Sequence, residues 1–251
     1  MSPEQALEPF VRKWLAFWPE QAVLDVFTPE RHKAASRAWG SLLFELHACA
    51  FSLEHDPVRE QKSLWWSQEL RAAEQGSAKH PITQALQGHP AAYGGLAAQL
   101  LSLAQQAPVR AGDRNALAAV LTPFADAVVR IEQDLFGGEG HSPPDSVSAQ
   151  LLAMRLPHGV QAFDRAMIPM NLLARHQSLD QIADERALLQ DWLADLSAML
   201  PSAGQDGNWF RAAQSRFTQR RIRQLQSSKT PGVRPGHVWD AWRAMRSRFP
   251  G

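Results

Sequence analysis

Apolar residues recur at three- and four-residue steps along most of this 251-residue chain. The clearest run lies in residues 34–53, where the apolar positions at this spacing are Trp39, Leu42, Leu43, Leu46, Ala50 and Leu53. Such spacing predicts a helix with a broad apolar face. The same period predicts further helices over residues 58–75, 91–106, 115–136, 146–155, 179–200, 209–226 and 239–249.

Signals for strands are nearly missing from the sequence, and the breaks between the predicted helices are short. The chain has one tyrosine and no sustained alternation of apolar and polar residues, which strands would require. Pro57 limits the first helix, and Gly76 closes the second. Further breaks fall at residues 108–113, 137–144, 201–208 and 230–236, none long enough for an interdomain linker. We therefore expect an all-α helical bundle that forms a single domain over residues 1–251.

Composition supports a globular protein with a sizeable core. Hydrophobic residues make up 45% of the chain and charged residues 20%, and no apolar run approaches the roughly 20 residues of a membrane span. Cys49 is the single cysteine, so no internal disulfide forms, and we expect a buried core thiol. Without a secretory leader pattern, the sequence predicts a cytoplasmic protein, with a peripheral membrane location left open.

The net charge of +1 conceals an uneven distribution of charge. Residues 211–251, here called the basic C-terminal segment, hold ten Lys or Arg and one acid, Asp240. The other 16 basic and 24 acidic side chains leave the first 210 residues at −8. A segment of this kind can contact an anionic membrane surface, a phosphate or a protein partner, or bind the acidic body of its own chain. Nucleic acid is disfavoured as a partner, because the chain has no recognition module and little net charge.

Two stretches carry motifs of a known family. In the first, Lys62 precedes Trp65-Trp66, an acidic-Leu pair follows at Glu69-Leu70, and His80-Pro81 comes about ten residues later. In the second, Arg155 and Arg165 precede the run Ile168-Pro169-Met170-Asn171-Leu172-Leu173. In this order and at this separation the stretches resemble the squalene/phytoene synthases, and the resemblance spans about residues 30–225.

The resemblance implies an isoprenoid-synthase-like bundle around a deep apolar channel. Enzymes of that family join two prenyl diphosphates head to head, using two aspartate-rich motifs that face each other across the channel mouth. The carboxylates bind Mg²⁺, which bridges them to the diphosphate and neutralises the leaving group. Aspartates four residues apart share one helical face and can therefore share metal ions.

This sequence departs from the family at both aspartate motifs. With Arg165 and Pro169 as anchors, the positions of the second pair of aspartates are held by Leu156 and Val160. Where the first pair should stand, between residues 48 and 56, the only acids are Glu54 and Asp56, which lie on different faces of a helix. We therefore expect no metal site and no catalytic residues. We expect a ligand pocket instead, with these candidate residues: Phe44, Phe51, Trp65, Trp66, Arg155 and Arg165.

Other chemistry finds little support in the sequence. The nine histidines include no pair at i and i+4, so no helical His-x₃-His metal site exists. Neither a nucleophile elbow nor a phosphate-binding or dinucleotide fingerprint occurs. The nine tryptophans either fill a large helical core or line a channel for an isoprenoid or acyl chain. Adjacent helical residues diverge by about 100°, so Trp65 and Trp66 cannot both point inward.

Two functions follow from the resemblance and its departures. In the first, the protein is a catalytically degenerate member that needs no cofactor and binds an isoprenoid or another lipid, or acts as an assembly or scaffold factor. In the second, it is an active prenyltransferase that condenses prenyl diphosphates with Mg²⁺. Because both aspartate motifs are lost, we favour the first.

Overall fold

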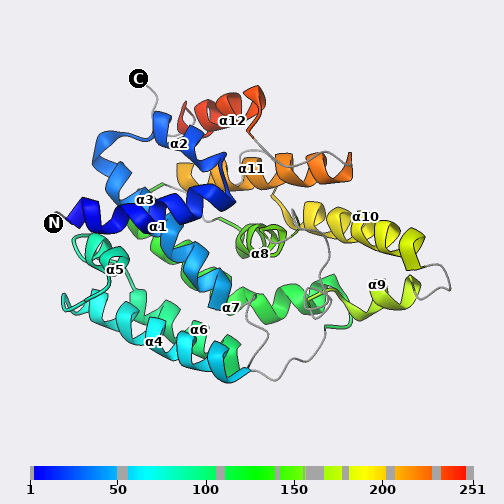
Figure 1. The fold of residues 1–251 in the computed structure, drawn as a ribbon, viewed down its shortest axis with the longest axis horizontal. Coiled ribbons are helices and arrows are strands. Elements are labelled where there is room, and N and C mark those ends of the chain that lie inside the picture. Colours follow the sequence, from blue (N-terminus) through cyan, green and yellow to red (C-terminus); the bar gives the residue numbers. More distant parts are fainter. Residues whose placement is uncertain are drawn as a thin grey trace.

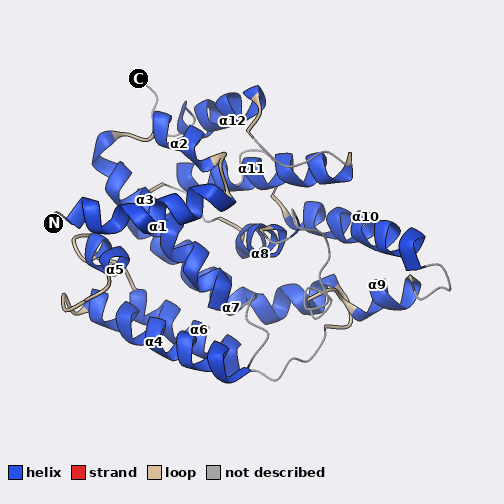
Figure 2. Ribbon diagram, in the orientation of Figure 1, coloured by secondary structure: helices blue, strands red, loops and turns tan. Residues whose placement is uncertain are grey.

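The computed structural model describes residues 3–49, 56–105, 111–138, 142–154, 156, 167–176, 181–201, 207–227 and 233–246. Over these residues the chain forms twelve α-helices and no strand. The helices are α1 (Pro3–Phe17), α2 (Gln21–Phe27), α3 (Glu30–His47), α4 (Asp56–Glu74), α5 (Pro81–Leu86), α6 (Tyr93–Gln105), α7 (Arg114–Phe136), α8 (Pro144–Ala153), α9 (Met170–Arg175), α10 (Gln181–Met199), α11 (Trp209–Gln226) and α12 (Pro235–Arg246). The prediction of an all-α bundle is therefore confirmed (Figure 2).

The helices pack in a series that crosses the molecule. Helix α4 packs on α6, α6 on α7, α7 on α8, α8 on α11, and α11 on α12. Helices α1, α3 and α5 pack on one another beside this series, and α10 packs on α8 and α11. In Figure 1, α8 is seen end-on near the middle, while α4 and α12 lie at opposite edges.

Helices α3 and α8 are buried on nearly all sides. Every residue of α8 from Ser146 to Ala153 is buried, as is every residue of α3 from Ala38 to His47. A helix enclosed on all sides needs no single apolar stripe, which is why the apolar face of α3 looked broad in the sequence. Gly40 lets α1 approach, because a Cβ at this position would collide with the indole of Trp14.

One hydrophobic core joins the two stretches that carry the family motifs. Trp66 and Leu70 of α4 belong to the same cluster of buried residues as Leu151 and Leu152 of α8 and the following Leu156. The two stretches therefore contribute to the same core.

Local signals fix several helix ends. The Asp113 carboxylate accepts a hydrogen bond from Ala116 N at 2.8 Å and caps α7, and the Asn208 side chain accepts one from Arg211 N at 2.8 Å and caps α11. Gly76 follows α4 with a φ of 74°, a left-handed conformation that favours glycine.

The predicted break at residues 230–236 is wrong at its end, because α12 already begins at Pro235. Proline suits the first turn of a helix, where its missing N–H costs no hydrogen bond.

Candidate functional site

The two motifs of the first stretch meet at the junction of α4 and α5. The ring of His80 lies 4.9 Å from that of Trp66 and 5.5 Å from that of Trp65, between ring centroids, and Phe10 of α1 packs on its edge at 4.5 Å. Trp66 is 3% exposed and Trp65 is 42% exposed. Only one of the two tryptophans faces the core, as the helical geometry predicts.

Glu69 is the acid of the first motif, and its carboxylate is occupied by hydrogen bonds within the chain. One carboxylate oxygen accepts hydrogen bonds from Lys79 N at 3.1 Å, His80 N at 3.0 Å and the Thr83 hydroxyl at 2.9 Å. Burial opposes ionisation of this group, but the hydrogen bonds from His80, Thr83 and Lys79 outweigh it and lower the pKa of Glu69. Glu69 therefore holds the turn that leads into α5, and that role explains an acid at this point of the motif.

His80 itself is built into the same turn. Its Nδ1 accepts a hydrogen bond from Ile82 N at 3.3 Å, which caps the N-terminus of α5. Burial lowers the pKa of His80, although Glu69 and Glu45 oppose that shift. The Trp-Trp and His-Pro motifs thus form a structural joint between α1, α4 and α5.

Phe44 of α3 packs against α1. It is a buried residue of α3 whose ring packs on Phe17 of α1 at 5.3 Å, with Lys13 Nζ at 5.4 Å over its face. Lys13 Nζ also forms an ion pair with the neighbouring Glu45 at 2.5 Å. Helix α1 therefore covers Phe44.

The candidate ligand pocket can be followed only in part. Phe44, Trp65 and Trp66 are described, whereas Phe51, Arg155 and Arg165 lie outside the described residues. The proposed lining of this pocket by all six residues stays a prediction.

At the second motif, the described residues have structural roles. Leu156 is 2% exposed and belongs to the hydrophobic core, while Val160 lies outside the described residues. Farther along, Met170 N donates to Ala111 O at 2.8 Å and Asn171 N to Gly112 O at 3.0 Å. The Leu-Pro-like run therefore anchors the start of α9 to the loop before α7.

A buried polar network lies between α3, α7, α8 and α11. Glu132 accepts hydrogen bonds from Trp39 Nε1 at 3.0 Å and from Arg211 Nε at 2.8 Å, and a terminal guanidinium nitrogen of Arg211 completes a two-pronged ion pair. Arg211 also donates to Gln150, whose amide donates to Gln214 at 2.8 Å. Trp39, Glu132 and Arg211 have no surface accessible to water. Side chains therefore fill this part of the bundle.

The network continues from α11 to the N-terminal helices. The amides of Gln214 and Gln21 exchange two hydrogen bonds, at 2.7 and 2.8 Å. About two turns farther along α11, Arg221 forms a second buried ion pair with Glu20, with Nε 3.0 Å from the carboxylate, and its guanidinium lies 4.4 Å from the ring centre of Trp18. The first and last quarters of the chain are thus joined by buried polar contacts.

Sequence reasoning missed Glu132 and Arg211 as partners, although one signal was available. Glu132 lies four residues after Val128 and four before Phe136, both buried, so it occupies the apolar face of α7. An acid at such a position predicts a buried partner of opposite charge.

The structure also separates the members of the basic C-terminal segment. Arg211, Arg221 and Arg220 bind acids of the same chain: Glu132, Glu20 and Asp240, respectively. Arg223, Arg234, Arg243 and Arg246 are exposed. Internal pairing therefore accounts for part of the segment.

Potential metal ligands do not gather in the described part of the chain. There, no group of three or more His, Cys, Asp or Glu residues could hold a metal ion. The side chains of Glu54 and Asp56 are outside the described residues. Cys49 is buried, as predicted, and burial raises the pKa of its thiol to about 11.

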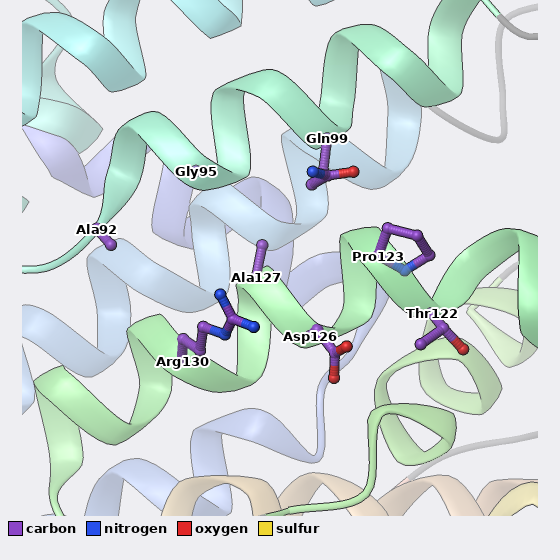
Figure 3. Close-up of a pocket in the computed structure, with 8 residues that line it drawn as sticks. All are labelled: Ala92, Gly95, Gln99, Thr122, Pro123, Asp126, Ala127 and Arg130. Carbon is purple, nitrogen blue, oxygen red and sulfur yellow. The ribbon is translucent and has the colours of Figure 1, made fainter.

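One cavity of about 310 Å³ opens between α6 and α7. Figure 3 shows its lining, which includes Gln99 of α6 and Thr122, Asp126 and Arg130 of α7. Pro123 also lines it, inside α7, where its lack of an N–H interrupts the hydrogen bonding of the helix. Of the candidate pocket residues that the structure describes, Phe44, Trp65 and Trp66, none lines this cavity.

Comparison with solved structures identifies the class of fold. A dehydrosqualene synthase in complex with ligand matches over 98% of both chains, with a TM-score of 0.57 and 12% sequence identity. The squalene synthase HpnC from Alicyclobacillus acidocaldarius matches over 98% of this chain and 95% of its own, with a TM-score of 0.51 and 14% identity. No protein-family model and no curated protein matches the sequence. The chain therefore has a squalene/phytoene-synthase-like fold.

Proposed function

We propose that this protein is a catalytically degenerate squalene/phytoene-synthase-like protein that serves as a binding or assembly module. The observation that carries the proposal is Leu156. The resemblance places a metal-binding aspartate at this position, and the chain has instead an apolar side chain that is enclosed in the core. Leucine offers no lone pair to a metal ion.

Two buried acids of the described residues are already bound within the chain, which supports a protein without a Mg²⁺ site. This ion requires oxygen ligands in a near-octahedral arrangement, whereas the carboxylates of Glu69 and Glu132 are already committed to contacts within the chain. Glu69 accepts three hydrogen bonds from the α5 turn, and Glu132 is neutralised by Arg211. Release of either acid for a metal would break these contacts.

The polar side chains buried between α3, α7, α8 and α11 also support catalytic degeneracy. An enzyme that joins two long prenyl chains needs an apolar channel to hold them. Here, hydrogen-bonded polar groups without water-accessible surface occupy the interior between those helices.

The first prediction concerns turnover. Purified protein with farnesyl or geranylgeranyl diphosphate and Mg²⁺ is expected to release no diphosphate and to form no squalene or phytoene above a protein-free blank. Gas chromatography of the hydrocarbon fraction measures this, with an active squalene synthase as the positive control. Mg²⁺-dependent formation of either hydrocarbon would show that the chain is a prenyltransferase.

The second prediction concerns Arg155 and Arg165. If both line a former channel mouth, they can bind a phosphate or carboxylate on an apolar tail directly, because the planar guanidinium grips two oxygens without a metal. We expect Arg155→Ala and Arg165→Ala each to weaken binding of a fluorescent prenyl or acyl phosphate about tenfold, or about 1.4 kcal/mol. The melting temperature should change little.

Arg71→Ala is the matched control for this experiment, because Arg71 is an exposed arginine of α4. Its removal should leave probe binding unchanged. If the probe never binds, or if the two substitutions chiefly lower the melting temperature, the arginines are structural. Asp164 and Asp145 are then the candidate partners, because they are close in sequence.

A further inference from the structure

Helix α12 turns an unusual face to solvent. Its inward face is made by His237, Asp240, Ala241, Ala244 and Met245, which are buried against α11 and α2. On the outward face, Trp239 is 60% exposed and Trp242 is 38% exposed, with their ring centroids 5.8 Å apart. Large apolar side chains gather here on the side of the helix that does not hold it to the protein.

Basic residues accompany these rings. Arg243 and Arg246 are exposed on the same face, and the Arg246 guanidinium lies 4.9 Å from the ring centre of Trp242. Asp240 is the only acid of the helix, and it points inward, where it accepts from Arg220 Nε at 2.6 Å. The outward face of α12 is therefore aromatic and positively charged, without an acid to offset it.

We propose that the outward face of α12 docks on an anionic phospholipid membrane. A helix that lies in a membrane interface combines tryptophan or other apolar side chains with arginine and lysine. Indole rings favour the headgroup region, because they have an apolar body and an N–H donor. Arginines near an anionic surface add attraction of about 1 kcal/mol each. Trp239, Trp242, Arg243 and Arg246 meet both requirements on one exposed face.

The size and charge of the face favour a membrane over a protein partner. Twelve residues make a helix about 18 Å long, and a strip of that length about 10 Å wide covers far less than the roughly 800 Å² per partner of a stable protein complex. A membrane sets no such minimum area, because attachment grows with the apolar area that is buried and with the attraction to anionic lipid. None of the described helices is apolar and long enough to cross a membrane.

Position in the fold agrees with this assignment. Helix α12 lies at one edge of the molecule, with its outer side uncovered by other described helices (Figure 1). The opposite edge, formed by α4, also exposes Leu64, but exposed acids and bases occur there in equal number: Glu60, Lys62, Arg71 and Glu74. The α4 edge therefore makes a matched comparison with little net charge.

Cosedimentation of the full chain with vesicles tests the proposal. We expect binding to vesicles of phosphatidylcholine with phosphatidylglycerol and none to phosphatidylcholine alone. Arg243→Gln with Arg246→Gln should weaken this binding about thirtyfold. Each arginine contributes about 1 kcal/mol, and a loss of about 2 kcal/mol lowers the binding constant by that factor. Trp239→Ala with Trp242→Ala should weaken it at least tenfold. Raising the salt from about 0.1 M to about 1 M shortens the Debye length from about 10 Å to about 3 Å and should release the protein.

Two control variants test whether the loss of exposed charges or apolar groups elsewhere on the protein has the same effect as a change in α12. Arg12→Gln with Arg71→Gln makes the same change in net charge on α1 and α4, and Leu64→Ala with Val120→Ala removes exposed apolar groups from α4 and α7. Both control variants should bind the vesicles like the unchanged protein. Circular dichroism checks that every variant is folded.

The proposal is overturned if the unchanged chain stays in the supernatant with anionic vesicles, or if the α12 variants bind as well as the controls. It is also overturned if α12 instead joins two copies of the chain, seen as a dimer in light scattering that Trp239→Ala with Trp242→Ala abolishes. These readouts do not involve prenyl diphosphates, so their outcome is independent of whether the chain is an enzyme.

Discussion

Glu132→Leu is expected to lower the free energy of unfolding by about 3 to 5 kcal/mol. The substitution leaves the Arg211 guanidinium charged and fully buried without its carboxylate, and it leaves Trp39 Nε1 without an acceptor. Desolvation of an unpaired charge is far more costly than the loss of an exposed contact. Urea unfolding followed by far-UV circular dichroism measures the change.

A double-mutant cycle and an exposed ion pair provide the controls. Replacing both partners, with Glu132→Leu and Arg211→Met, should cost clearly less than the sum of the two single changes, because no charge is left unpaired. Glu8→Leu breaks the pair of Glu8 with Arg12, whose side chains are 45% and 75% exposed, and should cost less than about 1 kcal/mol. If Glu132→Leu is as mild as Glu8→Leu, water reaches Arg211 and the interior between α7 and α11 is open.

Most of the long helices could be predicted from apolar spacing and from their ends. The prediction of residues 209–226 coincides with α11, whose start is fixed by the Asn208 cap, and that of residues 115–136 differs from α7 by one residue. Such helices span several turns, so the 3.6-residue period is well sampled. The predicted helix of residues 34–53 agrees with α3 as far as His47, where α3 ends, and residues 50–53 lie outside the described residues.

The helices that sequence analysis missed are short or contain a proline. Helices α2, α5 and α9 have seven, six and six residues, too few to display a period, and tertiary packing holds them. Helix α1 is longer, but Pro9 lies inside it, where a proline usually marks an end.

The family motifs could be placed from sequence, but the partners of the buried charges could not. Trp65 and Trp66 lie on one side of the turn between α4 and α5 and His80 lies at its end, so residues that are close in sequence meet in the fold. Arg211 instead finds Glu132 at a separation of 79 residues, and Arg221 finds Glu20 at 201. The charge pattern of residues 211–251 therefore looked uniform, although burial divides its arginines into core and surface groups.

Leu156→Asp is expected to lower the free energy of unfolding by about 4 kcal/mol or more. The substitution restores the residue that the family resemblance implies at this position, but it places a carboxyl group where Leu156 is 2% exposed. The loss of apolar burial adds to the cost of desolvating a polar group that has no partner. Leu156→Met, which conserves volume, should cost less than about 1.5 kcal/mol.

The pH dependence of Leu156→Asp separates a core position from a former metal site. Burial raises the pKa of a carboxyl group above its unfolded value, because it disfavours the charged form. The protonated variant is therefore relatively more stable at acidic pH, and that stability is lost as the pH rises through the pKa of the folded state. Urea unfolding of the variant across this range should show the deficit growing from acidic to neutral pH, with no recovery when Mg²⁺ is added. If Leu156→Asp is instead as stable as Leu156→Met at neutral pH, or if Mg²⁺ stabilises it, residue 156 faces an open channel mouth. Catalytic degeneracy would then rest on the loss of the aspartates alone.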